Sequence, residues 1–94
     1  MAFEFEWDPA KAAANLVEHQ VSFAEASTVF HDPLSLTVSD PRHSRTEERF
    51  AILGRSAHGR LLAVYHTDMD RRVRIVSARL ATRLERVLYE EESA

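Results

Sequence analysis

The fold is decided by residues 49–67, which read RFAILGRSAHGRLLAVYHT. Two apolar runs, 49–55 and 60–67, flank the segment Ser56-Ala57-His58-Gly59. Glycine readily takes the positive φ angle that a tight turn between two strands requires. The stretch therefore predicts an antiparallel β-hairpin, which a second polar turn follows over residues 68–71.

Three further segments alternate apolar and polar residues, which is the pattern of a half-buried strand. They are residues 3–7, 34–39 and 72–77. In the last of them Val73 and Ile75 share one face, whereas Arg72 and Arg74 share the other. This strand should therefore present a row of arginines to water. The polar segment 40–46 predicts a loop.

The first helix is predicted over residues 9–19, because Asp8 is a suitable N-cap and Pro9 suits the first helical position. Its apolar face is expected to contain Ala12, Ala13, Leu16 and Val17. A polar stripe at spacing i, i+4, i+8 contains Lys11, Asn15 and His19. A polar stripe on a helix is usually structural and solvated, and we interpret this one so.

The second helix is predicted to begin at Ser22, which forms with Glu25 the pattern of a capping box. Its buried stripe contains Phe23, Ala26, Val29 and Phe30, and Asp32-Pro33 ends it. A third helix is predicted from about Arg79. Its apolar stripe at i, i+4, i+7 and i+8 consists of Leu80, Leu84, Val87 and Leu88.

These elements predict one α+β domain over residues 1–94, in the order β-α-α-β-β-β-β-α, with helices packed on one face of a mainly antiparallel sheet. The other face would stay exposed. The chain contains no cysteine, which excludes disulfides, a thiolate nucleophile and cysteine-bound metals. Neither a signal segment nor an apolar run of about 18 residues is recognisable, so we expect a cytoplasmic protein.

Charge is segregated along the chain. Residues 1–41 carry a net charge of −6, residues 42–86 carry +6, and Glu90-Glu91-Glu92 adds −3. All cations of the basic segment are arginines. The planar guanidinium suits phosphate, so the pattern indicates contact with phosphate or with an acidic partner. It agrees equally well with salt bridges on a solvated surface.

An anion-binding surface would form on the exposed sheet face if the arginine-bearing strands are neighbours. Cleavage of RNA through the ribose 2′-hydroxyl needs a base, an acid and cations near the phosphate, but no metal. By residue type, Glu47, Glu48 and His66 could supply the base and the acid. Glutamate beside arginine is also typical of a solvated surface, and a histidine beside Asp68 also of a structural hydrogen bond. The histidines lack metal-ligand spacing, so neither a metal site nor a cofactor is predicted.

The whole chain resembles the BrnT family. The motifs that carry the resemblance are Phe5-Glu6-Trp7-Asp8-Pro9-Ala10-Lys11, Asn15, His19, Val21-Ser22-Phe23-x-Glu25-Ala26, Glu48-Arg49-Phe50, Gly54-Arg55-Ser56 and Arg74-Ile75-Val76-Ser77-Ala78-Arg79. The resemblance implies a RelE-like fold and a ribonuclease toxin of a type II toxin–antitoxin system, for which we expect metal-independent cleavage of single-stranded RNA. One departure is Gln20, which stands where the family commonly has glycine, at the helix C-cap.

The resemblance also implies a BrnA-type antitoxin with a ribbon-helix-helix part, through which the complex would contact DNA. It implies an RNA site, for which we expect a catalytic set of Glu48, Arg49, Arg74 and Arg79. The expected RNA-binding residues are Lys11, His19, Arg55, Arg72, Ser77 and Arg83. Two alternatives stay open: a catalytically inactive co-repressor that only binds the antitoxin, and an RNA-binding module that does not cut.

Overall fold

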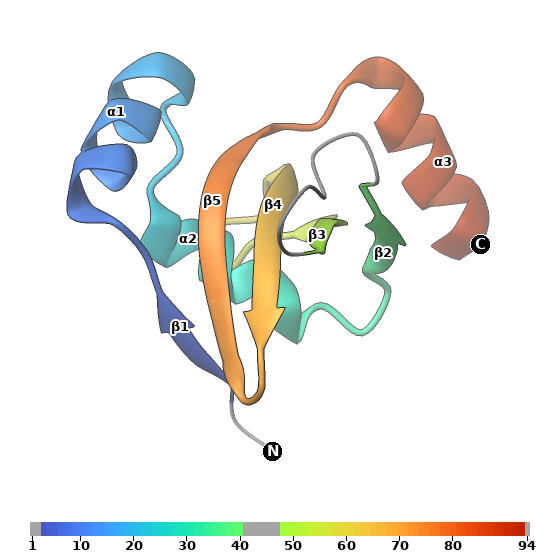
Figure 1. Ribbon diagram of the computed structural model, residues 1–94. Coiled ribbons are helices and arrows are strands. Elements are labelled where there is room, and N and C mark those ends of the chain that lie inside the picture. The colour runs from blue at the N-terminus through green and yellow to red at the C-terminus, as the bar shows by residue number, and fades with distance from the viewer. Residues whose placement is uncertain (1–2, 41–47, 94) are drawn as a thin grey trace.

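The hairpin predicted over residues 49–67 forms the middle of a five-stranded sheet in the computed structural model, which describes residues 3–40 and 48–93 (Figure 1). The elements in chain order are β1 (Glu4–Glu6), α1 (Pro9–His19), α2 (Phe23–Thr28), the short 3-10 helix η1 (Val29–His31), β2 (Leu36–Ser39), β3 (Arg49–Arg55), β4 (Leu61–Met69), β5 (Arg72–Leu80) and α3 (Arg83–Ser93). The predicted α+β class and element order are confirmed. The predicted loop over 40–46 falls, from residue 41 on, outside the described residues.

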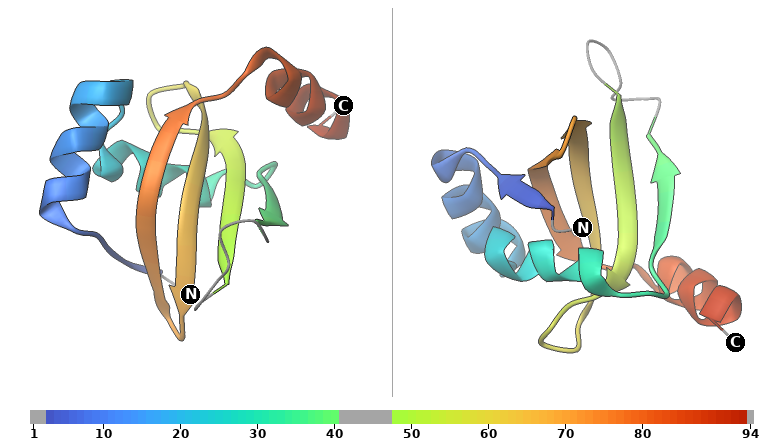
Figure 2. Two further views of the ribbon diagram at one scale, coloured as in Figure 1. Left: turned by 45° about the horizontal axis from the view of Figure 1, so that its top comes forward. Right: turned by 90° about the horizontal axis from the view of Figure 1, so that it is seen from below.

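The strands lie in the order β1-β5-β4-β3-β2, so the first strand of the chain, β1, lies beside the last strand, β5 (Figure 2). β1 pairs with β5 in parallel, and the other three pairings are antiparallel. Gly59 has a φ angle of 80° in the turn between β3 and β4, as the hairpin prediction required. In the parts of the chain that the structure describes, no helix is long and apolar enough to cross a membrane.

Each face of the sheet has its own apolar cluster, because successive residues of a strand point to opposite sides. On the first face, β3 and β4 contribute Ile52, Leu62 and Val64, which pack with Phe23 of α2. On the second face they contribute Leu53, Leu61 and Ala63, which pack with Tyr89 of α3. The expectation that the helices share one face therefore holds for α1 and α2, whereas α3 covers part of the second face.

The start and the orientation of α3 differ from the prediction. β5 continues to Leu80, which pairs with Leu62, and the helix begins only at Arg83. Thr82 caps it in a reciprocal capping box: the Glu85 amide donates to Thr82 Oγ1 (3.1 Å), and the Thr82 amide donates to Glu85 Oε1 (2.9 Å). The predicted apolar stripe of Leu80, Leu84, Val87 and Leu88 is exposed. Tyr89 takes the buried position because only its side of the helix faces the sheet.

The predicted apolar face of α1 is correct at Ala12, which packs against the core, but wrong at Leu16 and Val17, which are exposed, whereas Asn15 is only 5% exposed. The Asn15 amide donates to the carbonyls of Val21 and Ala78, both at 2.9 Å, and its oxygen accepts from the Ala78 amide at 3.1 Å. The side chain thus satisfies the backbone of β5 where no neighbouring strand does so. Asn15 is therefore structural, as predicted, but it is buried and not solvated.

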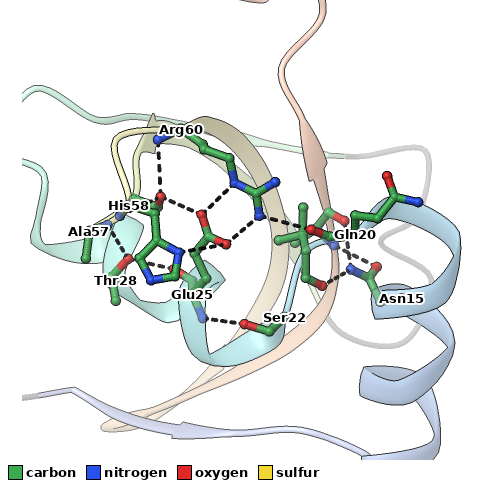
Figure 3. A network of polar contacts seen from close by, with 11 residues as sticks. Asn15, Gln20, Ser22, Glu25, Thr28, Ala57, His58 and Arg60 are labelled. Atoms are coloured by element: carbon green, nitrogen blue, oxygen red, sulfur yellow. Dashed lines mark hydrogen bonds and ion pairs between the residues drawn. The ribbon is translucent and has the colours of Figure 1, made fainter.

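An ion pair between buried Glu25 and partly exposed Arg60 joins α2 to the hairpin (Figure 3). The Glu25 amide donates to Ser22 Oγ (3.0 Å), which is half of the predicted capping box. The Glu25 carboxylate does not complete the box, because it pairs with Arg60 and accepts from Ser56 Oγ at 2.7 Å. The hydrogen bonds from Arg60 are the main reason why the pKa of Glu25 is lowered to about 2. Arg60 also donates to the carbonyl of Gln20, at 3.0 Å.

Gln20 ends α1 in the left-handed conformation, with φ 56°. Its amide donates to the Leu16 carbonyl, as in a helix C-cap that usually contains glycine. The left-handed conformation costs a residue with a Cβ atom about 1 kcal/mol. We therefore expect Gln20→Gly to raise the free energy of unfolding by up to about 1 kcal/mol, reduced by the greater freedom of glycine in the unfolded chain. Urea denaturation measures this, and Gln20→Ala, which keeps the Cβ atom, should give no gain. A less stable glycine variant would contradict the prediction.

Candidate functional site

A β-bulge brings two distant arginines of β5 to the same face of the sheet. Arg74 and Arg79 are five positions apart, and an odd separation places two side chains on opposite faces of a regular strand. The register between β4 and β5 shifts at Val76, which has no partner in β4. This extra residue restores the alternation, so that Arg74, Ser77 and Arg79 all point to the second face.

A row of polar side chains crosses the second face. Glu6, Arg74, Thr67 and Arg49 lie opposite one another on β1, β5, β4 and β3. Residues directly opposite share a face, and neighbouring strands are about 4.8 Å apart, so Arg49 and Arg74 flank Thr67 within roughly 10 Å. Arg72 lies two residues before Arg74 on the same face. We call Glu6, Tyr65, Thr67 and the arginines at 49, 72, 74 and 79 the arginine face.

Arg79 is held in place by two neighbours. It donates to both oxygens of Glu85, at 2.8 and 3.0 Å, and to the Tyr65 hydroxyl at 2.9 Å. Its guanidinium also lies over the Tyr65 ring, 5.6 Å from the ring centre. The hydrogen bonds with Glu85 raise the pKa of Arg79, and the same contacts lower the pKa of Glu85. Both groups are therefore charged at neutral pH.

Glu6 holds the other two arginines of β5. Its carboxylate accepts from Arg74 at 2.8 Å and from Arg72 at 3.2 Å. Sequence reasoning missed Glu6, Tyr65 and Glu85, which all contact these guanidinium groups. The alternation of Glu6 with Phe5 and Trp7 could have placed it on the wet side of β1, whereas only the register of β4 and β5 brings Tyr65 to Arg79.

Thr67 is a buried hydroxyl in the centre of the row. Its residue is 4% exposed, and among the described residues Oγ1 has no hydrogen-bond partner. A buried polar atom without a partner costs about 1–3 kcal/mol. Thr67 thus lies between Arg49 and Arg74 in the strand register, and its hydroxyl is a buried donor without a partner in the described part of the chain.

Comparison with known proteins assigns the chain to a family. A family model described as the ribonuclease toxin BrnT of type II toxin–antitoxin systems matches residues 7–85. The chain belongs to the BrnT family. The crystal structure of the Brucella abortus ribonuclease toxin BrnT is similar, with a TM-score of 0.63 and 18% sequence identity over 87% of this chain and 100% of that chain. This similarity confirms the fold, and the family match confirms the resemblance inferred from the motifs. No curated protein sequence matches the chain.

Not every residue expected in the BrnT site lies on the arginine face. Glu48 precedes Arg49 and therefore points to the opposite side, where its carboxylate accepts from Ser39 Oγ at 3.3 Å. Lys11 and His19 lie on α1, which packs through Ala12 on the first face. The structure thus separates these three from the arginines, and Glu47 lies outside the described residues.

Two expected RNA-binding arginines lie near α3 instead. Arg55 is at the far end of β3, where it donates to the Gly59 carbonyl (3.3 Å) and lies 5.7 Å from the centre of the Tyr89 ring. Arg83 is the exposed first residue of α3. Both are outside the row that contains Arg49 and Arg74.

His66 is a structural residue and not an acid–base group of the arginine face. It is 3% exposed on the first face, with its ring near Phe30 and Phe50 at centre distances of 4.8 and 5.7 Å. Nδ1 lies 2.7 Å from Asp68 Oδ1. Burial lowers the pKa of His66, although Asp68 opposes this effect. The hydrogen-bonding alternative is therefore confirmed. Within residues 3–40 and 48–93, no group of three histidine or acidic side chains could hold a metal ion.

Proposed function

We propose that this BrnT protein is an endoribonuclease that cuts single-stranded RNA without a metal ion. The observation that carries the proposal is the arginine face, the side of the sheet that Arg49, Arg74 and Arg79 share with Glu6 and Tyr65. Membership of a family of ribonuclease toxins supports the same activity. Single-stranded RNA fits best, because its flexible backbone allows in-line attack.

In the proposed reaction the ribose 2′-oxygen attacks the neighbouring phosphorus. The 2′-O–P bond forms and the P–O5′ bond breaks, which leaves a 2′,3′-cyclic phosphate and a 5′-hydroxyl end. A base removes the 2′ proton and an acid protonates the departing 5′ oxygen. The guanidinium groups of Arg49, Arg74 and Arg79 stabilise the additional negative charge on the phosphorane.

The proton transfers fall to two residues that flank β5. We assign the base to Glu6, whose carboxylate lies beside Arg74, and the acid to Tyr65. Because the Tyr65 hydroxyl accepts a hydrogen bond from Arg79, its own proton is available for the leaving oxygen. β1 and β4 are two strand spacings apart, and Tyr65 lies two residues along β4 from the row of Glu6, so the Cα atoms of Glu6 and Tyr65 are about 12 Å apart. This distance accommodates a phosphate between the base and the acid.

The proposed partners follow from the family. A type II system contains a protein antitoxin, and we propose a BrnA-type antitoxin whose ribbon-helix-helix part contacts DNA for the complex. The toxin itself would contact RNA in the cytoplasm. No cofactor takes part in the proposed reaction.

One observation favours the inactive co-repressor as a second candidate. The guanidinium groups of Arg72, Arg74 and Arg79 are already paired with Glu6 and Glu85. Guanidinium groups that stay paired in this way would not hold a phosphate, and the face would then serve only to contact the antitoxin. Cleavage of RNA by the isolated protein distinguishes the two candidates.

The test uses a labelled single-stranded RNA, the purified protein and an excess of EDTA. The proposal predicts shortened RNA with 2′,3′-cyclic phosphate ends. A DNA strand of the same sequence is the matched control, and it should stay intact because it has no 2′-hydroxyl. Intact RNA with folded protein would reject the ribonuclease, and loss of cleavage in EDTA would reject metal independence.

A further inference from the structure

A small apolar cleft lies on the second face of the sheet, directly beside the arginine face. It has a volume of about 100 Å³. Strands β2, β3 and β4 line it, and α3 borders it through Leu88, in keeping with the position of α3 beside β2 in Figure 1. Val38 and Leu88 are 59% and 48% exposed, so the rim of the cleft reaches water. The cleft is also lined by Leu36, Ala51, Leu53, Ala63 and Glu85.

Two alanines explain why a hollow forms at this point of the sheet. Ala51 of β3 lies opposite Tyr65 of β4. Ala63 of β4 lies between Leu53 and Arg79 of the neighbouring strands. Residues directly opposite one another share a face of the sheet, so the methyl groups of both alanines lie among much longer side chains. The strand register thus places an apolar depression next to Tyr65 and Arg79.

The surroundings of the cleft match the two parts of a nucleotide. Arg79 borders it on β5, and Arg49 lies two residues before Ala51 on the same face of β3, about 7 Å away. A nucleotide joins a phosphate, which suits these guanidinium groups, to a flat ring with apolar faces. The bases of single-stranded RNA are unstacked and can turn into such a cleft. Charge and continuity with the arginine face therefore favour a nucleobase as the occupant.

We propose that the cleft binds one pyrimidine base of the RNA. The proposal rests on the proposed function, because it takes RNA to be the ligand of the arginine face. Size determines the choice of a pyrimidine, since an enclosed apolar cavity of roughly 150 Å³ holds one benzene ring. The cleft is smaller but open at its rim, so it accommodates a single six-membered ring whose polar edge stays in water. The second ring of a purine finds no room between Ala51 and Leu88.

Glu85 can bind the polar edge of this nucleobase. An ionised carboxylate has about four lone-pair sites. Glu85 uses three of them, two for Arg79 and one for the Thr82 amide. The remaining site is on Oε2. Cytosine and uracil both have an N–H donor on the edge away from the sugar, so either base can use it.

The positions of Glu6 and Tyr65 determine which nucleotide enters the cleft. Glu6, the proposed general base, lies on β1 and acts on the 2′-oxygen of the nucleotide on the 5′ side of the cut. Tyr65, the proposed general acid, acts on the leaving oxygen of the nucleotide on the 3′ side. Ala51 lies opposite Tyr65 on the side away from β1. The cleft therefore selects the nucleotide directly 3′ of the cut.

The first test maps the cuts in a single-stranded RNA of mixed sequence by sequencing the new 5′ ends. We expect the wild-type protein to cut at least about tenfold faster before a pyrimidine than before a purine, the usual discrimination of an apolar pocket by size. The nucleotide on the 5′ side of the cut, which does not enter the cleft, should change the rate less than about threefold.

Two variants change the cleft in opposite directions. Leu88→Ala opens it, so cutting before purines should become faster and the preference should fall below about threefold. Ala51→Leu fills it, so cutting before pyrimidines should instead slow to the purine rate. Leu84→Ala is the matched control, because Leu84 lies one turn before Leu88, is 79% exposed and does not line the cleft. It should keep the wild-type preference, and circular dichroism checks that each variant is folded.

Binding to strands that cannot be cut separates this proposal from the ribonuclease. The probes are tetranucleotides of uridine and of adenosine that carry a methyl group on every 2′-oxygen, and fluorescence anisotropy measures their affinity. The wild-type protein should bind the uridine strand about tenfold more tightly, and Ala51→Leu should lose this difference. If a protein that cuts no RNA gives these results, the nucleobase site stands and the ribonuclease fails.

Several results would overturn the nucleobase site while leaving the ribonuclease intact. Equal cutting before pyrimidines and purines would remove the selection, and a preference confined to the nucleotide on the 5′ side would place the nucleobase elsewhere. A preference that persists in folded Ala51→Leu would show that the cleft is not its cause. An unchanged purine rate in Leu88→Ala would show the same, even if Ala51→Leu does not fold. If Ala51→Leu keeps its RNA binding but loses binding of the protein encoded next to the toxin gene, the cleft belongs to that protein.

Discussion

Arg60→Ala is expected to lower the free energy of unfolding by about 3 kcal/mol, the low end of the cost of removing one partner of a buried ion pair, because the Arg60 side chain is 35% exposed. Glu25 is only 5% exposed, and Arg60 supplies most of the donors to its carboxylate (Figure 3). Without Arg60, Ser56 would be left as the main donor to a buried negative charge. The variant would also lose the bond to the Gln20 carbonyl, which ties α1 to the hairpin.

Urea denaturation followed by circular dichroism measures this loss. Arg71→Ala is the matched control, because Arg71 is exposed in a turn and its removal should change stability by less than about 0.5 kcal/mol. Adding Glu25→Gln to Arg60→Ala removes the uncompensated charge, so the double variant should recover part of the loss. A double variant that loses the sum of both single effects would contradict the explanation.

The effect of Arg60→Ala should depend on pH. In the folded protein the pKa of Glu25 is about 2, below its ordinary value of 4.5. The pair therefore stabilises the fold fully above pH 4.5, and this contribution disappears as the pH falls toward 2. In Arg60→Ala, burial should instead raise the pKa of Glu25. The stability difference between the two proteins should then shrink between pH 7 and pH 3, and a constant difference would show that Glu25 is not its cause.

The elements of the fold that could be predicted from the sequence are those with local signals. The hairpin follows from two apolar runs around Gly59, and α1 follows from Asp8 and Pro9, which begin the helix in the structure as expected. Periodicity and capping depend on neighbours within a few residues, which the sequence contains directly. The orientation of a helix depends on tertiary packing. For this reason the buried sides of α1 and α3, set by Asn15 and Tyr89, were predicted incorrectly.

In the candidate site, too, the features set by local sequence were predicted and those set by tertiary packing were not. The row of Arg72 and Arg74 follows from alternation alone, and the structure places it on an exposed face. Arg79 was expected at the start of a helix, and it reaches this face only because Val76 forms a bulge in β5. A bulge is a property of the pairing of two strands, so the sequence of β5 alone does not predict it. Glu48 does not lie on the arginine face for a related reason. Its neighbour Arg49 points to the second face, so Glu48 points to the first.

Arg79→Ala is expected to reduce the rate of RNA cleavage about 100- to 1000-fold under the proposed function. This is the usual loss when one donor to a developing anion is removed. Arg79 also contacts the proposed acid, Tyr65. Arg79→Lys keeps the charge but loses the planar pair of donors, so it should recover no more than about tenfold. The measurement is single-turnover cleavage of the labelled RNA at saturating protein.

A merely structural role of Arg79 predicts a different pattern. Arg79 binds Glu85, and its removal could disturb α3 instead of the reaction. Glu85→Gln tests this, because glutamine keeps a capping oxygen for Thr82 but removes the charge that holds Arg79. If Arg79 contacts the phosphate, Glu85→Gln should lose less than about tenfold, since the Tyr65 hydroxyl still binds the guanidinium, which is freed from the charge of Glu85 for RNA. If Arg79 only anchors α3, both variants should lose activity equally, in step with their stability. Equal losses would therefore remove Arg79 from the proposed site, even if the wild-type protein cuts RNA.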